Sequence, residues 1–246
     1  MQWIYLSPHL DDTALSCGGL IWDQVQAGQD VEVWTLCAGD PPPHNFSAFA
    51  EELHARWALS PEAAIAARRE EDRQAMAVLG APYRHFSIPD AIYRLHPKTG
   101  ELMYFDWEDV TGGLHPGDEG YLRQKAQELA GELAGEVSLV SPLTVGNHVD
   151  HQFTRVLAEM LGLPLLYYPD YPYTMQYDDQ IPYLLPTGAK KETFAVSPQG
   201  LAAWQDSVAA YASQISTFWA SEAEMRDGIR TFSEQFGGVP LFKSSQ

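Results

Sequence analysis

The chain alternates short apolar runs with longer helical patterns, and this alternation restricts its fold more than any other feature. Five runs have the length and the β-branched or aromatic content of buried strands: WIYLS, VEVWTLC, RHFSI, VSLVSP and LPLLYY, which begin at residues 3, 31, 84, 137 and 163. Helical patterns lie between and after them, at 11–27, 60–79, 120–136, 150–161, 198–221 and 220–236. We therefore expect an α/β fold, with a Rossmann-like, mostly parallel sheet flanked by helices on both faces.

Composition limits both the organisation of the chain and its partners. The 246 residues, of which 45% are hydrophobic, suit a single domain over 1–246, with an irregular insertion at about 90–120 and an aromatic loop at about 169–186. A formal net charge of −18 disfavours nucleic acid and anionic membranes as partners. No apolar run has the length of a membrane span, and the two cysteines show no C-x-x-C spacing, so we expect a cytoplasmic protein.

Two clusters of histidine and aspartate follow predicted strands. SPHLDD at 7–12 follows the first strand, and NHVDH at 147–151 follows the fourth. A Rossmann-like strand order of 3-2-1-4-5 makes these two strands neighbours, and ligands of such sheets bind beyond the carboxyl ends of the strands where the order reverses. We therefore expect the two clusters, although distant in the sequence, to share one crevice.

Residues of these clusters have the chemistry of a catalytic metal site. His9, Asp12 and His151 would supply two imidazoles and one carboxylate and would leave a position open for water, which is typical of catalytic rather than structural zinc. The same donor set also suits Fe²⁺. A bound cation of this kind lowers the pKa of its water towards 7 and polarises a carbonyl oxygen.

The remaining cluster residues have roles that a hydrolase needs. Asp11 is adjacent to a predicted ligand and would take the proton of the water as general base. His148 would either stabilise an oxyanion or protonate a leaving nitrogen, and Asp150 would hold a histidine in its working tautomer. The alternative for Asp11 or Asp12 is an ordinary helix cap, since aspartate is common at that position.

The two clusters together resemble the LmbE-like, PIG-L type N-acetylglucosaminyl de-N-acetylase superfamily. SPHLDDTALSCGG and NHVDHQ carry the resemblance, and R-x-x-E at 68–71, IPD at 88–90 and YASQ at 211–214 are similar to further segments of that family. The resemblance implies a zinc-dependent hydrolase in which metal-bound water removes an N-acetyl or related N-acyl group from an amino-sugar conjugate. It implies the same metal ligands and general base, with Asp150 supporting His148 at the oxyanion.

The resemblance also adds residues and shows departures. It implies that Arg68 and Asp90 contact the substrate. Leu10 and Thr13 stand where the family usually has proline and glutamate, and neither change removes a predicted ligand.

Two alternatives remain open at this point. The first is a sugar-binding or metal-binding protein of the same fold without deacetylase activity, although a base beside the ligands has no use in such a protein. The second concerns the aromatic side chains, which would either wall a sugar pocket or cover a sheet edge or a subunit interface, and the latter would make the protein a homo-oligomer. These aromatic residues are Trp107, Tyr167, Tyr168, Tyr171, Tyr173 and Tyr177.

Overall fold

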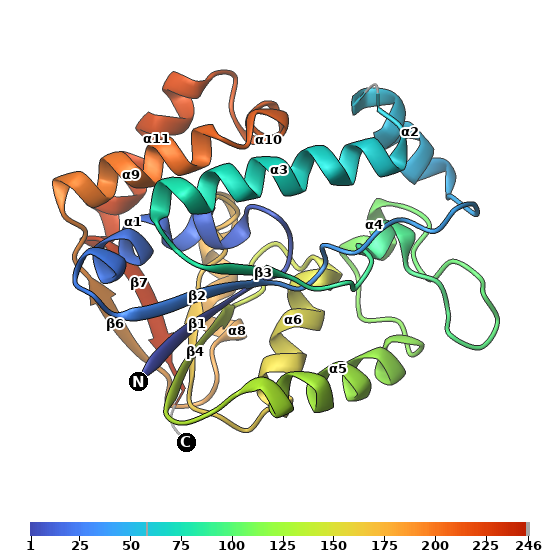
Figure 1. Ribbon diagram of the computed structural model, residues 1–246, viewed down its shortest axis with the longest axis horizontal. Helices are drawn as coiled ribbons and strands as arrows, with labels where there is room; N and C mark the ends of the chain where they lie inside the picture. The colour runs from blue at the N-terminus through green and yellow to red at the C-terminus, as the bar shows by residue number, and fades with distance from the viewer. Residues whose placement is uncertain (58, 245–246) are drawn as a thin grey trace.

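The computed structural model, which describes residues 1–57 and 59–244, contains a seven-stranded sheet in the order β3-β2-β1-β4-β5-β7-β6 (Figure 1). The strands are β1 (Gln2–Ser7), β2 (Asp30–Thr35), β3 (Tyr83–His85), β4 (Val137–Pro142), β5 (Leu165–Tyr168), β6 (Lys190–Phe194) and β7 (Val239–Lys243). The first five strands run parallel to one another, with Ile4 of β1 opposite Leu139 of β4. The predicted Rossmann-like order and the mostly parallel sheet are thereby confirmed.

Strands β7 and β6 extend the sheet beyond β5: β7 pairs antiparallel with β5, and β6 pairs antiparallel with β7. The sequence-based prediction missed both. Strand β6, KKETF, lies at the sheet edge and is mostly exposed, so it lacks the apolar pattern of a buried strand. Charged side chains on such an edge discourage pairing with other chains. Strand β7 contains Pro240, a residue that normally argues against a strand assignment.

Helices cover both faces of the sheet (Figure 1). One face carries α1 (Asp12–Gln26), α3 (Pro61–Leu79), α9 (Pro198–Ala209) and α11 (Glu222–Phe236), and the other carries α5 (Asp118–Glu132) and α6 (Val149–Met160). Alternate residues of β1 divide between the two cores, since Tyr5 packs on the first face and Ile4 and Leu6 pack on the second. Burial on both faces explains why the parallel strands read as continuous apolar runs.

Shorter elements complete the chain. They are α2 (Ala48–Trp57), η1 (Ala91–Tyr93), α4 (Trp107–Val110), α7 (Thr174–Tyr177), η2 (Asp178–Gln180), α8 (Ile181–Leu184) and α10 (Ala212–Phe218). Helix α2 was not predicted, and the predicted helix over 198–221 is two helices, because Tyr211 leaves the helical conformation at φ −84° and ψ 58°. Across the described residues, no helix has the length and the hydropathy required to cross a membrane.

Gly18 and Gly19 of α1 permit close packing against α9 and the residues just before it. A Cβ atom on Gly18 would lie 2.6 Å from Trp204 Cδ1 of α9, and one on Gly19 would lie 2.7 Å from Val196 Cγ1. Trp204 is fully buried there, and its indole nitrogen donates to the Leu15 carbonyl oxygen at 3.0 Å. The glycines thus let α9 settle on α1, the helix that begins at the predicted site.

We expect Gly18→Ala to lower the free energy of unfolding by about 1–3 kcal/mol, because the added methyl group overpacks the contact with Trp204. Gly131→Ala is the matched control, since a Cβ atom there, in exposed α5, meets nothing within 4 Å. That substitution should stabilise the protein by about 0.5–1 kcal/mol through helix propensity. Urea unfolding measures both changes, and a Gly18→Ala protein as stable as the parent would contradict this account of the packing.

Candidate metal centre

The turn between β1 and α1 carries the first predicted cluster. Ser7, the last residue of β1, caps α1, because its hydroxyl oxygen accepts a hydrogen bond from the Thr13 backbone nitrogen at 3.1 Å. The Asp11 side chain makes no cap hydrogen bond, and the Asp12 carboxylate accepts instead from the His9 backbone nitrogen at 2.8 Å. Asp11 thus occupies the N-cap position of α1, as the alternative prediction had it, but its side chain makes no capping hydrogen bond, and Asp12 is the first residue of the helix.

The second cluster joins the first because β1 and β4 are neighbours. His151 lies in the first turn of α6, which follows β4. Its Nε2 atom is 3.4 Å from Asp12 Oδ1, and His9 Nδ1 is 3.1 Å from Asp12 Oδ2. The ligand atoms of the three predicted metal-binding residues thus lie within 4.8 Å of one another.

Two further carboxylates hold the other nitrogen of each imidazole. Asp150 Oδ2 is 3.0 Å from His9 Nε2, and Asp170 Oδ1 is 2.7 Å from His151 Nδ1. Histidines that bind metals typically donate their second N–H to a carboxylate in this way, which fixes the tautomer and the ring orientation. Asp170 was not predicted, although its place directly after β5, the neighbour of β4, is a signal that could have identified it.

The groups of this site stabilise positive charge between them. Burial lowers the pKa of His151, but the carboxylates of Asp12 and Asp170 outweigh it and raise the pKa to about 10. Burial likewise opposes protonation of His9, yet hydrogen bonds with Asp12 and Asp150 hold its pKa well above the usual value. Burial would raise the pKa of Asp12, but the two imidazoles hold it well below its usual range. Protons on the two imidazoles, or a divalent cation, would supply this charge.

The distances also fit a metal. Ligand atoms about 2.0–2.1 Å from zinc in a tetrahedral arrangement stand about 3.3 Å apart. His9 Nδ1 lies 3.1 Å from Asp12 Oδ2 and His151 Nε2 lies 3.4 Å from Asp12 Oδ1, so each imidazole stands at about that separation from one of the two carboxylate oxygens. In His9, Nε2 contacts Asp150 and Nδ1 faces Asp12. In His151, Nδ1 contacts Asp170 and Nε2 faces Asp12. The residues present therefore fit a cation held by His9, Asp12 and His151.

A second donor set, formed by His9, His148 and Asp150, also has ligand spacing. Its carboxylate already has a cationic partner, because Asp150 Oδ1 pairs with the guanidinium of Arg94 and Oδ2 accepts from the Ala91 backbone nitrogen at 2.8 Å. Asp12 has no arginine or lysine partner within the described residues, so the first set is the better cation site.

A buried arginine, Arg94, forms ion pairs with two carboxylates, one of which contacts His9. Arg94 is fully buried between Asp150 and Asp118, with its Nε atom 2.9 Å from Asp118 Oδ1. Burial would raise the pKa of Asp150, but Arg94 and then His9 keep that pKa far below the usual value. The irregular segment that was expected at about 90–120 thus carries the cation that keeps Asp150 ionised beside His9.

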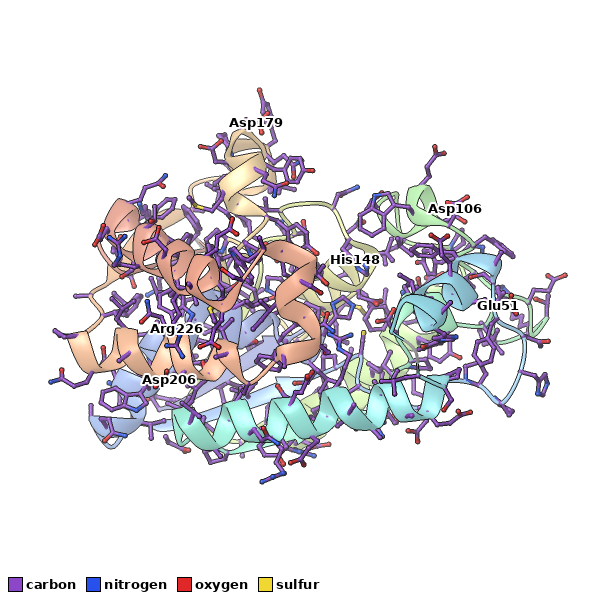
Figure 2. The ribbon with its side chains drawn as sticks, turned by 90° about the horizontal axis from the view of Figure 1, so that it is seen from above. Glu51, Asp106, His148, Asp179, Asp206 and Arg226 are labelled. Atoms are coloured by element: carbon purple, nitrogen blue, oxygen red, sulfur yellow. The ribbon has the colours of Figure 1, made fainter. Side chains whose placement is uncertain are left out.

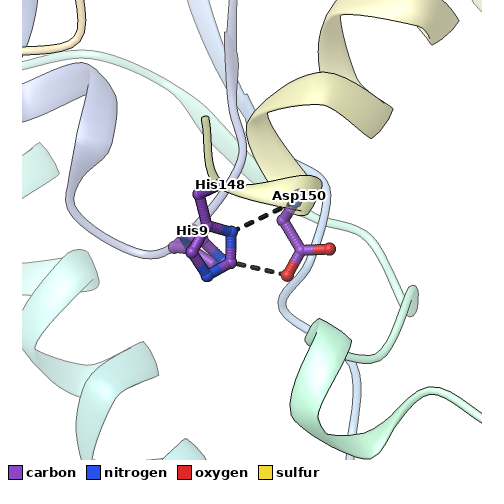
Figure 3. A group of neighbouring side chains, drawn as sticks. All are labelled: His9, His148 and Asp150. Atoms are coloured by element: carbon purple, nitrogen blue, oxygen red, sulfur yellow. Dashed lines mark hydrogen bonds and ion pairs between the residues drawn. The ribbon is translucent and has the colours of Figure 1, made fainter. Parts of the chain in front are cut away.

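His148 stands over the site and caps α6. Its Nδ1 atom accepts a hydrogen bond from the Asp150 backbone nitrogen at 3.1 Å, so a neutral ring carries its proton on Nε2. Burial and the charge of His9 lower its pKa to about 3. Figure 3 shows both histidines joined to Asp150, His9 through the carboxylate and His148 through the backbone.

The remaining predicted residues line a cavity of about 150 Å³ above the metal ligands. Asp11 Oδ1 lies 3.5 Å from Arg68 Nη2, and burial raises the pKa of Asp11 to about 6 against the opposing charge of Arg68. Asp90 Oδ2 is 3.7 Å from His9 Nε2. Burial also raises the pKa of Asp90. Asp11, Arg68 and Asp90 thus line the same cavity as His9.

Two of the supporting sequence segments meet across the cavity. Glu71 of α3 accepts hydrogen bonds from the backbone nitrogen and the hydroxyl group of Ser213, at 2.8 and 2.6 Å. Asp72 accepts from the Tyr211 hydroxyl group at 2.5 Å. These contacts fasten α10 to α3, so that Gln214 lines the cavity. From above, His148 lies between α10 on one side and α2 and α4 on the other (Figure 2).

Three of the six aromatic residues have neither predicted role, because they lie in the core rather than at a pocket, a sheet edge or an interface. Tyr167, Tyr168 and Tyr171 are buried in the sheet cores, so the sugar-pocket interpretation is wrong for them. Tyr173 and Trp107 line the cavity of the candidate site. The pocket interpretation therefore remains open for Trp107 and Tyr173, and for Tyr177, which lines an adjoining cavity.

We expect Arg94→Met to lower the free energy of unfolding by about 3–5 kcal/mol, because it leaves two buried carboxylates without their cation. Arg123→Met is the matched control, since Arg123 and its partner Glu119 are both largely exposed. The control should leave the urea midpoint almost unchanged. Equal midpoints for the two variants would contradict the stabilising role of Arg94.

Comparisons with known proteins agree with the geometry. The family model of GlcNAc-PI de-N-acetylases, PIG-L, matches residues 4–161. The chain is 28% identical over 198 residues to 2'-N-acetylparomamine deacetylase of Niallia circulans, which covers 72% of this chain and 69% of the relative. Zinc-inhibited teicoplanin deacetylase superposes with a TM-score of 0.81 at 27% identity, covering 99% of this chain and 97% of that one. A deacetylase–teicoplanin complex superposes with a TM-score of 0.79 at 25% identity, covering 99% and 96%.

Proposed function

The chain belongs to the PIG-L family of GlcNAc-PI de-N-acetylases, and from this we propose that it is a metal-dependent hydrolase that removes the N-acetyl group from an amino sugar within a larger conjugate. The observation that carries the proposal is the pair of imidazoles, each held by a carboxylate, that face the Asp12 carboxylate. The similarity to proteins described as deacetylases of N-acetylparomamine and teicoplanin supports the substrate class.

His9, Asp12 and His151 would hold the metal, with Zn²⁺ the first candidate and Fe²⁺ the second. When bound, such an ion acts as a Lewis acid on the amide carbonyl and makes water more acidic. Asp150 and Asp170 keep the two imidazoles oriented and basic enough to bind it.

Asp11 is the proposed general base. Its buried carboxyl group lines the cavity beside Asp12, and a pKa raised to about 6 suits proton transfer near neutral pH. In the hydrolysis, a water oxygen bonds to the carbonyl carbon, the C–N bond breaks, and acetate and the amine are released. Asp11 takes the proton of the water and returns it to the leaving nitrogen, so that no further acid is required.

His148 is the proposed hydrogen-bond donor to the oxyanion. Because its Nδ1 atom accepts from the Asp150 backbone and its pKa is lowered to about 3, the ring is neutral and carries its proton on Nε2. A neutral imidazole can donate to the carbonyl oxygen as negative charge develops there. The same properties disfavour the alternative in which His148 protonates the leaving nitrogen.

Arg68 and Asp90 are the proposed substrate contacts. Both line the cavity, where Asp90 lies near His9 Nε2 and Arg68 lies near the Asp11 carboxylate. A guanidinium group and a carboxylate offer a donor and an acceptor for the hydroxyl groups of a sugar.

We expect the purified protein to bind one zinc ion per chain and Asp12→Ala to lose it, because the carboxylate that faces both imidazoles is gone. His148→Ala should keep the metal, since His148 belongs only to the second donor set. Exposed Asp40→Ala is the control for the loss of a carboxylate. Metal analysis after dialysis measures all four proteins, and loss of zinc from His148→Ala but not from Asp12→Ala would overturn the assignment.

We expect Asp11→Asn to retain the metal while amine release from N-acetylglucosaminides falls by about 10²–10⁴-fold, because the general base is lost. Amine formation is followed with a reagent for primary amines, and zinc content is measured on the same sample. A zinc-loaded parent protein that is as slow as Asp11→Asn over a broad substrate panel would instead identify a binding protein without deacetylase activity.

A further inference from the structure

A second cavity, of about 440 Å³, adjoins the cavity above the metal ligands. The two cavities share four lining residues: Trp107, Tyr173, Thr217 and Phe218. We refer to the second one as the aromatic cavity, because Tyr177 brings the number of its aromatic lining residues to four. A sugar placed at the metal site would have its remaining substituents directed to such an adjoining space.

The aromatic side chains of this cavity remain accessible to a ligand. Trp107 is 58% exposed and Tyr177 is 41% exposed, although large aromatic groups are usually much more buried. Tyr173 and Phe218 pack edge to face with ring centroids 5.6 Å apart, so that these two rings support each other. Exposed aromatic faces next to a catalytic cavity are suited to stacking with a flat or apolar group.

The lining of the aromatic cavity is neutral. No carboxylate, lysine or arginine is among its lining residues in the described part of the chain, and its polar side chains include the amides of Gln176 and Gln180. The whole chain carries a net charge of −18, so an uncharged wall is a local exception. A polycationic conjugate would find no counter-charge there, whereas a neutral conjugate would lose no ionic hydration.

The wall of the aromatic cavity is fastened to the metal site. Gln180 Oε1 accepts a hydrogen bond from the Gly146 backbone nitrogen at 3.0 Å, close to the start of the loop that carries His148. At φ +87°, Gly146 places its backbone against the Tyr173 ring, where a Cβ atom would lie 3.1 Å from the ring. The Asp170 carbonyl oxygen accepts from the Thr174 backbone nitrogen at 3.3 Å, at the start of the helix that carries Tyr177. The distance between the two cavities is therefore set by the fold.

We propose that the substrate is an N-acetyl amino sugar linked to a neutral aromatic aglycone, which stacks in the aromatic cavity. This inference rests on the proposed function and adds the class of the group beyond the sugar. Trp107 and Tyr177 are the specificity-determining residues, because they offer the most exposed faces of the cavity. A conjugate with several amino groups, such as an aminoglycoside, is disfavoured by the uncharged lining.

The test compares amine release from three probes: p-nitrophenyl N-acetyl-β-D-glucosaminide, free N-acetylglucosamine and 2'-N-acetylparomamine. We expect kcat/KM for the aryl glycoside to exceed that for either of the others by about tenfold or more. Trp107→Ala and Tyr177→Ala should each lower the ratio of aryl glycoside to free sugar several-fold. Tyr183→Ala is the control, since Tyr183 is 90% exposed and does not line the aromatic cavity.

Binding to the Asp11→Asn variant separates failure of this inference from failure of the proposed function. Calorimetry should show tighter binding of the aryl glycoside than of free N-acetylglucosamine, and Tyr177→Ala in the same background should remove the difference. That result would support the aromatic cavity even if no probe were hydrolysed. Equal affinities, or tighter binding of 2'-N-acetylparomamine, would overturn the inference while leaving the deacetylase proposal to its own assay.

Discussion

The contact between Asp12 and two imidazoles is the interaction on which the candidate site depends. It brings the first turn of α1 and the residues just before it close to the first turn of α6. In the sequence, strands β2, β3 and β4 lie between these two turns. The other nitrogen of each imidazole contacts a carboxylate, that of Asp150 for His9 and that of Asp170 for His151. Buried Arg94 forms an ion pair with Asp150. The balance of buried charge therefore requires a cation at the centre, either as protons on the imidazoles or as a metal.

The fold explains why such a site forms at this place. Because β1 lies between β2 and β4, the turns after β1 and β4 open a crevice at the carboxyl edge of the sheet, where the strand order reverses. Helix α10, fastened to α3 by Glu71 and Asp72, closes one side of this crevice. The aromatic cavity extends it on the side of α4 and α7, so that the candidate metal ligands His9 and Asp12 line one part of a larger hollow.

The sequence predicted the parallel strands and the polar residues that follow them, and one physical cause explains both predictions. Parallel strands buried on both faces read as apolar runs, and the polar residues that end them stand out, so His9, Asp12 and His151 could be found before the structure was known. The Ser7 hydroxyl group makes the capping hydrogen bond for which the aspartate side chains were candidates. The sequence alone does not distinguish between these capping residues. Strand β6 was missed because this mostly polar edge strand lacks the pattern of a buried strand. Its partner in the sheet, β7, was missed as well.

Arg94 could not be predicted in the same way, since its role arises only from tertiary contact, whereas Asp170 shortly after β5 had a positional signal that the prediction did not use. Arg94 lies in a segment without periodicity, and its two carboxylate partners come from α5 and α6.

Anomalous X-ray diffraction at the zinc edge from a zinc-loaded crystal tests most directly the central claim that His9, Asp12 and His151 bind the metal. We expect a single strong peak bonded to His9 Nδ1, Asp12 and His151 Nε2. A peak bonded to His148 and Asp150, or no peak within reach of Asp12, would contradict it.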